Sequence, residues 1–295
     1  MKKHIGITTA MLSAFIFGFT HILVKMSYDG GGNGITVTFF RAAFAVPVLF
    51  VILRAKKIPF RVNRKEIRDL LVIGALGSAA TPLLLYTSYS YISVGLAAVL
   101  HFFFPVIITL ANVMFFKEKA SRPIVLSVML GIAGVALSFE GALTGNPLGF
   151  ALALASGVTH AVYMLGVQHT ALRGMHCFKI SFYLCIVQAA ISLPFGWNSQ
   201  SLVFQLTPAA WGYILAVSLF TVIGALSLLQ VSVRYAGATA AAVLSTIEPI
   251  TSVILGALLL SETFTPLKIL SAVFILASVV LVCGFRRESN RSSTS

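Results

Sequence analysis

Two ionisable side chains lie deep inside long apolar stretches, and each is followed within about one helical turn by a proline. Glu248 directly precedes Pro249 in the segment Ala-Ala-Val-Leu-Ser-Thr-Ile-Glu-Pro, and His101 lies four residues before Pro105 in Ala-Ala-Val-Leu-His-Phe-Phe-Phe-Pro. A carboxyl or imidazole group in such a place can bind a proton or a cationic group of a substrate. The proline also frees the backbone carbonyl four residues earlier, which adds an acceptor beside the side chain.

Each of these two residues also has a less specific interpretation. Glu248 can be a buried, protonated carboxyl that hydrogen-bonds a neighbouring helix, and His101 can be a neutral packing residue. A charged group at the centre of a bilayer costs at least about 2.5–3.5 kcal/mol on insertion scales, so Glu248 should face a cavity or a partner. We predict that Glu248 and His101 bind the substrate and couple a proton.

Five further polar side chains inside apolar runs are candidate substrate ligands: Arg41, His21, Tyr86, His160 and Tyr163. Arg41 lies about two turns into its run, where it can reach the outer interface, hold an anion or pair with Glu248. His160 and Tyr163 are three residues apart and share one face of a helix. For these five residues, ordinary packing or a place at the membrane interface is the alternative.

Ten apolar runs, each of about 20 residues, are long enough to cross a bilayer as helices and would position these side chains. The runs are residues 5–28, 34–53, 69–89, 93–116, 123–140, 147–168, 178–197, 208–231, 237–260 and 266–285. Hydrophobic residues make up 58% of the chain and charged residues 10%, which is too little charge to cover a water-facing surface. We predict an all-α integral membrane protein with ten transmembrane helices.

The distribution of basic residues predicts the orientation. The chain has 21 Lys and Arg residues against 8 Asp and Glu, a formal net charge of +13. If the N-terminus is cytoplasmic, nearly all of these lysines and arginines fall in the tails and connections of the cytoplasmic side. We therefore expect a multi-pass protein of the cell membrane with both termini in the cytoplasm. The same bias accounts for the positive charge without a nucleic-acid partner.

The chain contains one stretch twice. A shift of 144 residues superposes Tyr91–Pro105 on Tyr235–Pro249 and carries Glu118 onto Glu262. Five spans per half is an odd number, so the two copies must cross the membrane in opposite directions. Inverted repeats of this kind are typical of secondary transporters, whose binding site lies at the repeat interface. The predicted parts are a first repeat (1–143), a second repeat (144–287) and a disordered cytoplasmic tail (288–295).

These features favour transport by alternating access, in which kinks at Pro82, Pro105 and Pro249 act as hinges between rocking halves. Inverted repeats also occur in channels, so an ion- or solute-conducting channel is the alternative. The phosphate-binding pattern G-x-x-x-x-G-K-[ST] and the hydrolase patterns H-E-x-x-H and G-x-S-x-G are absent. The three cysteines lack metal-ligand spacing. We therefore expect no enzyme activity, no cofactor and no metal.

The sequence resembles the drug/metabolite transporter superfamily, specifically proteins with tandem EamA domains. The resemblance rests on residues 97–105 with Glu118, on residues 241–249 with Glu262, and on Arg41 in Thr-Phe-Phe-Arg. It covers essentially the whole chain and implies gradient-driven export of small metabolites, often amino acids or related compounds. His101 before Phe-Phe-Phe-Pro departs from the family pattern. The partners implied are a small-molecule substrate, a coupling proton and the lipid bilayer, and the oligomeric state stays open.

Overall fold

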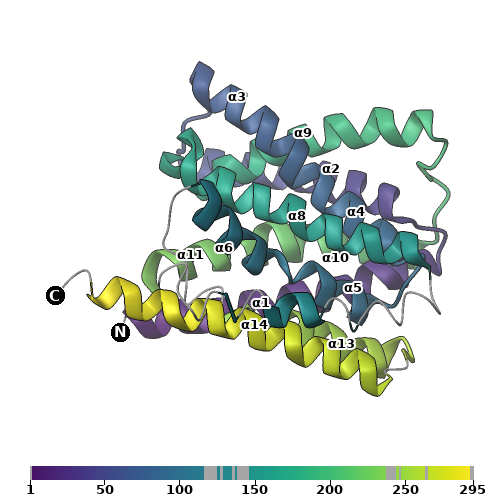
Figure 1. Cartoon of the computed structure of the whole chain (residues 1–295). Helices are drawn as coiled ribbons and strands as arrows, with labels where there is room; N and C mark the ends of the chain where they lie inside the picture. The colour runs from purple at the N-terminus through teal and green to yellow at the C-terminus, as the bar shows by residue number, and fades with distance from the viewer. Residues whose placement is uncertain are drawn as a thin grey trace.

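The regular structure of the chain is helical. The computed structural model describes residues 2–115, 125–126, 129–134, 137, 146–236, 244–245, 247–262 and 265–292. Within these ranges there are helices and turns but no strand (Figure 1). The prediction of an all-α chain is thereby confirmed.

The helices of the first half are α1 (Lys2–Tyr28), α2 (Gly34–Ala55), α3 (Arg64–Ile73), η1 (Gly74–Ala79), α4 (Ala80–Ser88), α5 (Val94–His101) and α6 (Phe104–Phe115). Those of the second half are α8 (Pro147–His169), η2 (Ala171–Gly174), α9 (Cys177–Asn198), α10 (Pro208–Ser218), η3 (Leu219–Ala225), α11 (Leu226–Ala236), α13 (Ile247–Leu259) and α14 (Pro266–Ser292). Two of the short segments, η1 and η3, are π-helical, and η2 is a 3-10 turn.

Six helical segments in the described part of the chain are long and apolar enough to cross a membrane. They are His4–Tyr28, Gly34–Ala55, Arg64–Ser88, Pro147–Val167, Cys177–Asn198 and Pro208–Leu229. The fourth and ninth predicted spans contain shorter apolar helices, Val94–Ile108 and Ile247–Leu259. Most of the fifth predicted span, 123–140, lies outside the described residues.

The surface of the bundle carries large apolar side chains, as a surface in lipid does. Examples from several helices are Val51, Met114, Trp197, Ile254 and Leu258. Leu258 is 73% exposed and Trp197 is 68% exposed, values that would be costly for such side chains in water. The fold is therefore that of a membrane protein.

The third span begins inside the basic connection. The Asn63 side chain accepts a hydrogen bond from the Glu66 N–H at 2.9 Å, and the Glu66 carboxylate accepts one from the Asn63 N–H at 2.8 Å. This reciprocal capping box satisfies two amide groups that a helix start would leave unpaired. It fixes the start of α3 at Arg64, five residues before the start of the predicted apolar run.

The chain turns at equivalent places in the two halves. The fourth predicted span stops at His101, turns through Phe102 and Phe103, and resumes as α6 at Phe104. In the second half the chain turns at Ser245 and resumes as α13 at Ile247. Under the 144-residue shift, His101 corresponds to Ser245.

The disturbance predicted at Pro105 and Pro249 therefore takes the form of a turn that precedes each proline, rather than a bend within a helix. Each proline lies in the first turn of a new helix, Pro105 in α6 and Pro249 in α13. A missing N–H costs nothing there, whereas inside a helix the ring would clash with the carbonyl of His101 or Ser245. In the first half, the chain avoids this clash by ending α5 at His101 and starting α6 at Phe104. Whether these breaks act as hinges stays a prediction.

A second irregularity also occurs once in each half. The third span of each half widens into a π-helix, η1 before Pro82 and η3 at residues 219–225. The Ala80 N–H after η1 reaches back five residues to the Ala75 carbonyl. Such π segments are rare and often occur at functional sites. Pro82, the third predicted hinge, thus follows a π turn rather than causing a simple kink.

One end of the bundle is held together by residues of the basic connections, and we call it the basic end. The Asp69 carboxylate accepts a hydrogen bond from the Ala171 N–H at 3.1 Å, which ties the start of α3 to the end of α8. The Lys179 ammonium donates to the Arg61 carbonyl and ties α9 to the same connection. The start of α1 and the end of α14 also lie at this end (Figure 1).

The other end, called the distal end, is held by polar contacts between loops. The Thr207 N–H donates to the Gly30 carbonyl at 3.1 Å, just after α1 ends. The start of α8 lies here too. Gly149, near the start of α8, packs on Tyr91 and Ile92 in the loop between α4 and α5, so closely that a Cβ atom would not fit. Consequently α1 runs from the basic end to the distal end, and α8 runs the opposite way.

The Glu262 carboxylate links the end of α13 to the start of α5 at the distal end. It accepts hydrogen bonds from the Val94 N–H and, at 3.1 Å, from the Gly95 N–H. These are the unpaired first amides of α5, and a negative charge there also complements the helix dipole. Glu118, its counterpart under the repeat shift, lies outside the described residues.

The predicted disordered tail begins inside a helix. α14 extends to Ser292, so at least residues 288–292 continue the last helix instead of leaving it. Arg286, Arg287 and Glu288 have high helix propensity, and extending an existing helix requires no new nucleus. Residues 293–295 lie outside the described part.

We predict that Glu262→Gln lowers the free energy of unfolding by about 1–2 kcal/mol, because the charged acceptor of two helix-start amides is lost. Thermal unfolding of the protein in detergent measures this as a lower Tm. Glu66→Gln is the matched control, since glutamine can replace glutamate in a capping box. Equal Tm values for the two variants would contradict the capping role of Glu262.

Candidate functional site

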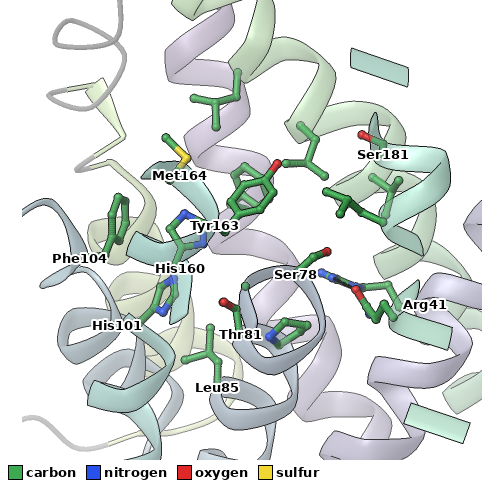
Figure 2. Close-up of a pocket in the computed structure, with 18 of the residues that line it drawn as sticks. Arg41, Ser78, Thr81, Leu85, His101, Phe104, His160, Tyr163, Met164 and Ser181 are labelled. Carbon is green, nitrogen blue, oxygen red and sulfur yellow. Dashed lines mark hydrogen bonds between the residues drawn. The ribbon is translucent and has the colours of Figure 1, made fainter. Parts of the chain in front are cut away.

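A single cavity of about 160 Å³ collects the polar side chains of both halves (Figure 2). All seven predicted substrate-binding residues line it, together with one predicted hinge: His21, Arg41, Pro82, Tyr86, His101, His160, Tyr163 and Glu248. It also takes residues from the π segments, Gly77 and Ser78 of η1 and Val222 of η3. The irregular backbone noted above therefore surrounds the cavity.

The two helix breaks place equivalent residues of the two halves at the cavity. His101 and Phe104 line it from the first half, and Ser245 and Glu248 line it from the second. The 144-residue shift superposes His101 on Ser245 and Phe104 on Glu248. The two copies of the repeat therefore contribute different chemistry from the same backbone positions, an imidazole and a phenyl ring against a hydroxyl and a carboxyl.

A second repeated motif, Gly-x-Thr-His, lies on the first helix of each half. It occurs at residues 18–21 of α1 and at residues 157–160 of α8. A Cβ atom on Gly18 would lie 2.6 Å from the Glu248 carbonyl, and one on Gly157 would lie 2.8 Å from the His101 carbonyl. Each glycine thus lets the first helix of one half contact the broken helix of the other. The two copies are 139 residues apart, so a search at the 144-residue shift misses them.

Glu248 is paired with His21. Its Oε1 atom lies 3.7 Å from His21 Nε2, and the two side chains are 14% and 6% exposed. The other ring nitrogen, Nδ1, lies 3.2 Å from the Ser252 hydroxyl, which in turn lies 3.2 Å from the Gly18 carbonyl. The sequence predicted a proton site formed by Glu248 with His101. Among the described residues, the imidazole within 4 Å of the Glu248 carboxyl is that of His21.

His101 has a similar environment without a carboxyl group. Its Nδ1 atom lies 2.9 Å from the Ser156 hydroxyl, which donates to the Ala153 carbonyl at 2.6 Å. Its ring packs against that of His160, with centroids 5.1 Å apart, and the His160 ring lies 4.5 Å from that of Phe104. Figure 2 shows these three rings together on one side of the cavity.

Arg41 lies on the other side of the cavity in Figure 2, and neutral groups hold its guanidinium. It donates to the Tyr86 hydroxyl at 3.1 Å and to Gln188 Oε1 at 3.2 Å. The Gln188 amide donates in turn to the Thr38 carbonyl at 2.8 Å, so its orientation is set. Arg41 Nε is buried, and no group in the described ranges forms a hydrogen bond with it. Arg41 therefore reaches neither the outer interface nor, by a direct contact, Glu248.

The sequence reasoning did not single out Gln188, although an amide inside an apolar run was a usable signal. Two further residues gain a place in the structure. Cys185 lines the cavity. Lys25 donates to the Tyr89 carbonyl at the end of α4, where a cation offsets the helix dipole.

The cavity offers charged or ionisable side chains at two points where a small polar molecule can bind. Arg41 provides a cation with an unused N–H, and Glu248 provides a carboxyl group partly open to the cavity. Aromatic rings from α4, α6 and α8 form the walls between them. In the part of the chain that the structure describes, no three His, Cys, Asp or Glu side chains come together as a metal site would require.

The sequence profile of the EamA-like transporter family matches residues 4–139 and again residues 147–284. The chain belongs to the EamA-like transporter family. Both matches cover the elements that line the cavity, and the boundary between them falls at residues 140–146. The resemblance predicted from the repeated segments is therefore confirmed.

Two known proteins resemble this EamA-like chain along nearly its whole length. The uncharacterized transporter sll1319 of Synechocystis sp. (strain ATCC 27184 / PCC 6803 / Kazusa) is 24% identical over 313 residues, which cover 94% of this chain and 92% of that protein. A crystal structure of a protein 16% identical superposes with a TM-score of 0.68 over 97% of this chain and 98% of the other. At that identity the superposition shows a shared fold alone.

We predict that Gly18→Ala destabilises this EamA-like protein by about 1–3 kcal/mol, because the added methyl group overlaps the Glu248 carbonyl and pushes α13 away from α1. Thermal unfolding in detergent measures the loss. Gly212→Ala in α10 is the matched control, since a Cβ atom there meets nothing within 4 Å. That change should be neutral or stabilise the helix by up to about 1 kcal/mol. Equal effects at the two glycines would contradict the close contact.

Proposed function

We propose that the protein is a secondary transporter that exports a small polar metabolite, such as an amino acid or a related compound, across the cytoplasmic membrane. The observation that carries this proposal is the cavity between the two repeats, lined by Arg41 and Glu248. Buried charges inside a membrane bundle are costly and usually mark the path of a substrate or an ion. The export direction rests on the sequence resemblance to exporters.

The proposal includes an inverted arrangement of two five-helix repeats, ten transmembrane helices in all. It is supported by the opposite directions of α1 and α8, the first helices of the two halves. It is also supported by a reciprocal contact, since Gly18 of α1 packs on Glu248 of α13 and Gly157 of α8 packs on His101 of α5. A site at the interface of such repeats is the usual position in secondary transporters.

Alternating access would close the cavity at one end while opening it at the other. At the distal end, polar contacts join α1 to the end of α4: Lys25 donates to the Tyr89 carbonyl, and the Tyr28 hydroxyl donates to the carbonyl of Tyr86, which lines the cavity. Toward the basic end, the cavity extends to Ser181, two residues from Lys179. We infer that this conformation gives access from the basic end, and that the breaks before Pro105 and Pro249 and the π turn before Pro82 are the hinges.

The positive-inside rule favours a cytoplasmic location for the basic end. Both termini would then be cytoplasmic, and the conformation described would face the cytoplasm, where an exporter loads its substrate. The distal contacts also favour a transporter over a channel, because a channel in its conducting state needs a continuous polar path. The absence of any single-channel current from the purified protein in planar bilayers would agree with this preference.

The cavity chemistry narrows the substrate class. Its volume of about 160 Å³ is below the range of about 300–1,000 Å³ typical of drug-sized ligands, which favours a small solute. A carboxylate or another anionic group of the solute would bind Arg41, whose Nε has no partner. A cationic or hydroxyl group would face Glu248, with the aromatic rings against its carbon skeleton.

We predict that Glu248→Gln abolishes transport while the protein remains folded in the membrane, because the amide keeps the shape but cannot ionise. Mass spectrometry of the growth medium measures the exported compound. The comparison is between cells that overproduce the unmodified protein and cells that overproduce the variant at equal membrane abundance. A small molecule enriched only with the unmodified protein is the expected result.

Glu66→Gln provides the control, since this carboxyl belongs to the capping box at the start of α3 and lies outside the cavity lining. Cells producing it should enrich the medium as the unmodified protein does. Equal export by Glu248→Gln would remove Glu248 from the site. Identical media from all the strains would contradict export and would move the test to uptake by proteoliposomes.

A further inference from the structure

We propose that Ser252 is a positioning residue that fixes the hydrogen on His21 Nδ1 and so makes Glu248 retain a proton while the cavity is empty. The role of this proton rests on the proposed transport function. If Glu248 is neutral, the charge of Arg41 leaves the cavity positive, which favours binding of an anionic group of the substrate. Its physical basis is the hydrogen-bond chain from the Gly18 carbonyl through Ser252 to His21, whose Nε2 atom lies 3.7 Å from Glu248 Oε1.

The direction of each hydrogen bond in this chain follows from a count of hydrogens. The Gly18 carbonyl can only accept, so the single hydroxyl hydrogen of Ser252 goes to it across 3.2 Å. The Ser252 oxygen must therefore accept from His21 Nδ1, also at 3.2 Å. In a neutral imidazole, one nitrogen carries the hydrogen and the other carries a lone pair. With Nδ1–H committed to Ser252, the lone pair is on Nε2, 3.7 Å from Glu248 Oε1.

This assignment controls whether the carboxyl group can ionise. An ionised Glu248 would face the Nε2 lone pair, which repels a carboxylate. One proton on the pair, either on the carboxyl oxygen or on Nε2, turns the repulsion into a hydrogen bond or an ion pair. Both groups are largely withdrawn from solvent, where an unpaired charge is costly. The pair therefore acts as a unit that holds one proton.

Charged and titratable groups on neighbouring helices also face the pair. They are Arg41 from α2, Tyr86 and Tyr89 from α4, and His101 from α5. Arg41 is already bonded to Tyr86 and Gln188, and Tyr89 presents its ring to His21 at 6.1 Å. From η3 and α11, which also pack on α1, the cavity receives the apolar residues Val222, Leu226 and Leu229. In the described part of the chain, none of these groups hydrogen-bonds the Glu248 carboxyl, and the buried Tyr89 hydroxyl has no hydrogen-bond partner there.

The first half provides an internal control. His101 Nδ1 is held in the same way, by Ser156, whose hydroxyl donates to the Ala153 carbonyl. At the position that corresponds to Glu248, however, the first half has Phe104. The serine–histidine arrangement is thus present twice, each time between the two halves, and in the part of the chain that the structure describes only the pair of Ser252 and His21 faces a carboxyl group. Loss of Ser156 should therefore leave the protonation of Glu248 unchanged.

The test measures the protonation of Glu248 directly, without a substrate. Dicyclohexylcarbodiimide reacts with a protonated carboxyl group: the proton moves to a carbodiimide nitrogen, the carboxylate oxygen adds to the central carbon, and rearrangement gives a stable N-acylurea. The adduct retains all atoms of the reagent, so mass spectrometry of the Glu248 peptide quantifies it. The measurement uses the full-length protein purified in detergent, over a series of pH values.

We expect Ser252→Ala to lower the labelling of Glu248 about threefold at about pH 7. A single hydrogen bond of ordinary strength changes the ratio of protonated to ionised Glu248 by about this factor. Without the serine, neutral His21 can carry its hydrogen on Nε2 and donate it to the ionised carboxylate, which stabilises the unreactive form. Ser156→Ala should label like the unmodified protein at every pH. A purely structural role of Ser252 would change the Tm without changing this pH profile.

Unchanged labelling in folded Ser252→Ala, or an equal change in Ser156→Ala, would overturn the proposal. If Ser252→Ala yields no folded protein, His21→Gln makes the same test, because it replaces the Nε2 lone pair with an amide that can donate to the carboxylate. Its labelling should also fall, and unchanged labelling would refute the role of the lone pair. Failure of the export experiment with a positive labelling result would reject the proposed function and leave this inference intact.

Discussion

The contact of two glycines with two broken helices is the constraint on which the rest of the structure depends. Inside a bilayer, a backbone that leaves the helical pattern must be buried in protein or line a cavity, because lipid offers its polar groups no partner. Gly18 and Gly157 allow α1 and α8 to cover the breaks in the opposite halves at distances that a side chain would forbid. The same crossings bring His21 to Glu248 and His160 to Phe104.

The packing of the protein follows from these contacts, in which the first helix of each half packs against the opposite half. The largest buried cluster contains residues of both repeats, including Ile22 of α1, Leu100 of α5 and Ile214 of α10. Neither repeat can bury these side chains alone, so the two matches to the EamA-like family describe one structural unit. The cavity lies at the centre of that unit because the breaks and the π turns leave space where regular helices would pack side by side.

The two halves have the same plan but different chemistry. Equivalent backbone positions carry His101 and Phe104 in one half and Ser245 and Glu248 in the other. A symmetric pair of carboxyls would place two charges in one small cavity, where their repulsion would be weakly screened. Instead, the described cavity lining has a single carboxyl group, which lies beside His21. Arg41 is the one Lys or Arg side chain among these lining residues, and its hydrogen-bond partners, Tyr86 and Gln188, are neutral. Divergence of the repeats thus produces a site with distinct ends.

The sequence by itself determined the membrane class, the family and which polar side chains line the cavity. Polar side chains inside apolar runs are costly in lipid, so each had to face the interior, and all seven that were predicted line one cavity. The tertiary structure alone decided which of them are partners. The neighbours His21 and Glu248 are 227 positions apart, and their contact depends on a crossing of helices that no local pattern encodes. The π turns and the breaks were equally hidden, because a proline pattern shows only that a regular helix is disturbed. Whether the chain bends, widens or stops is decided by the space that neighbouring helices leave.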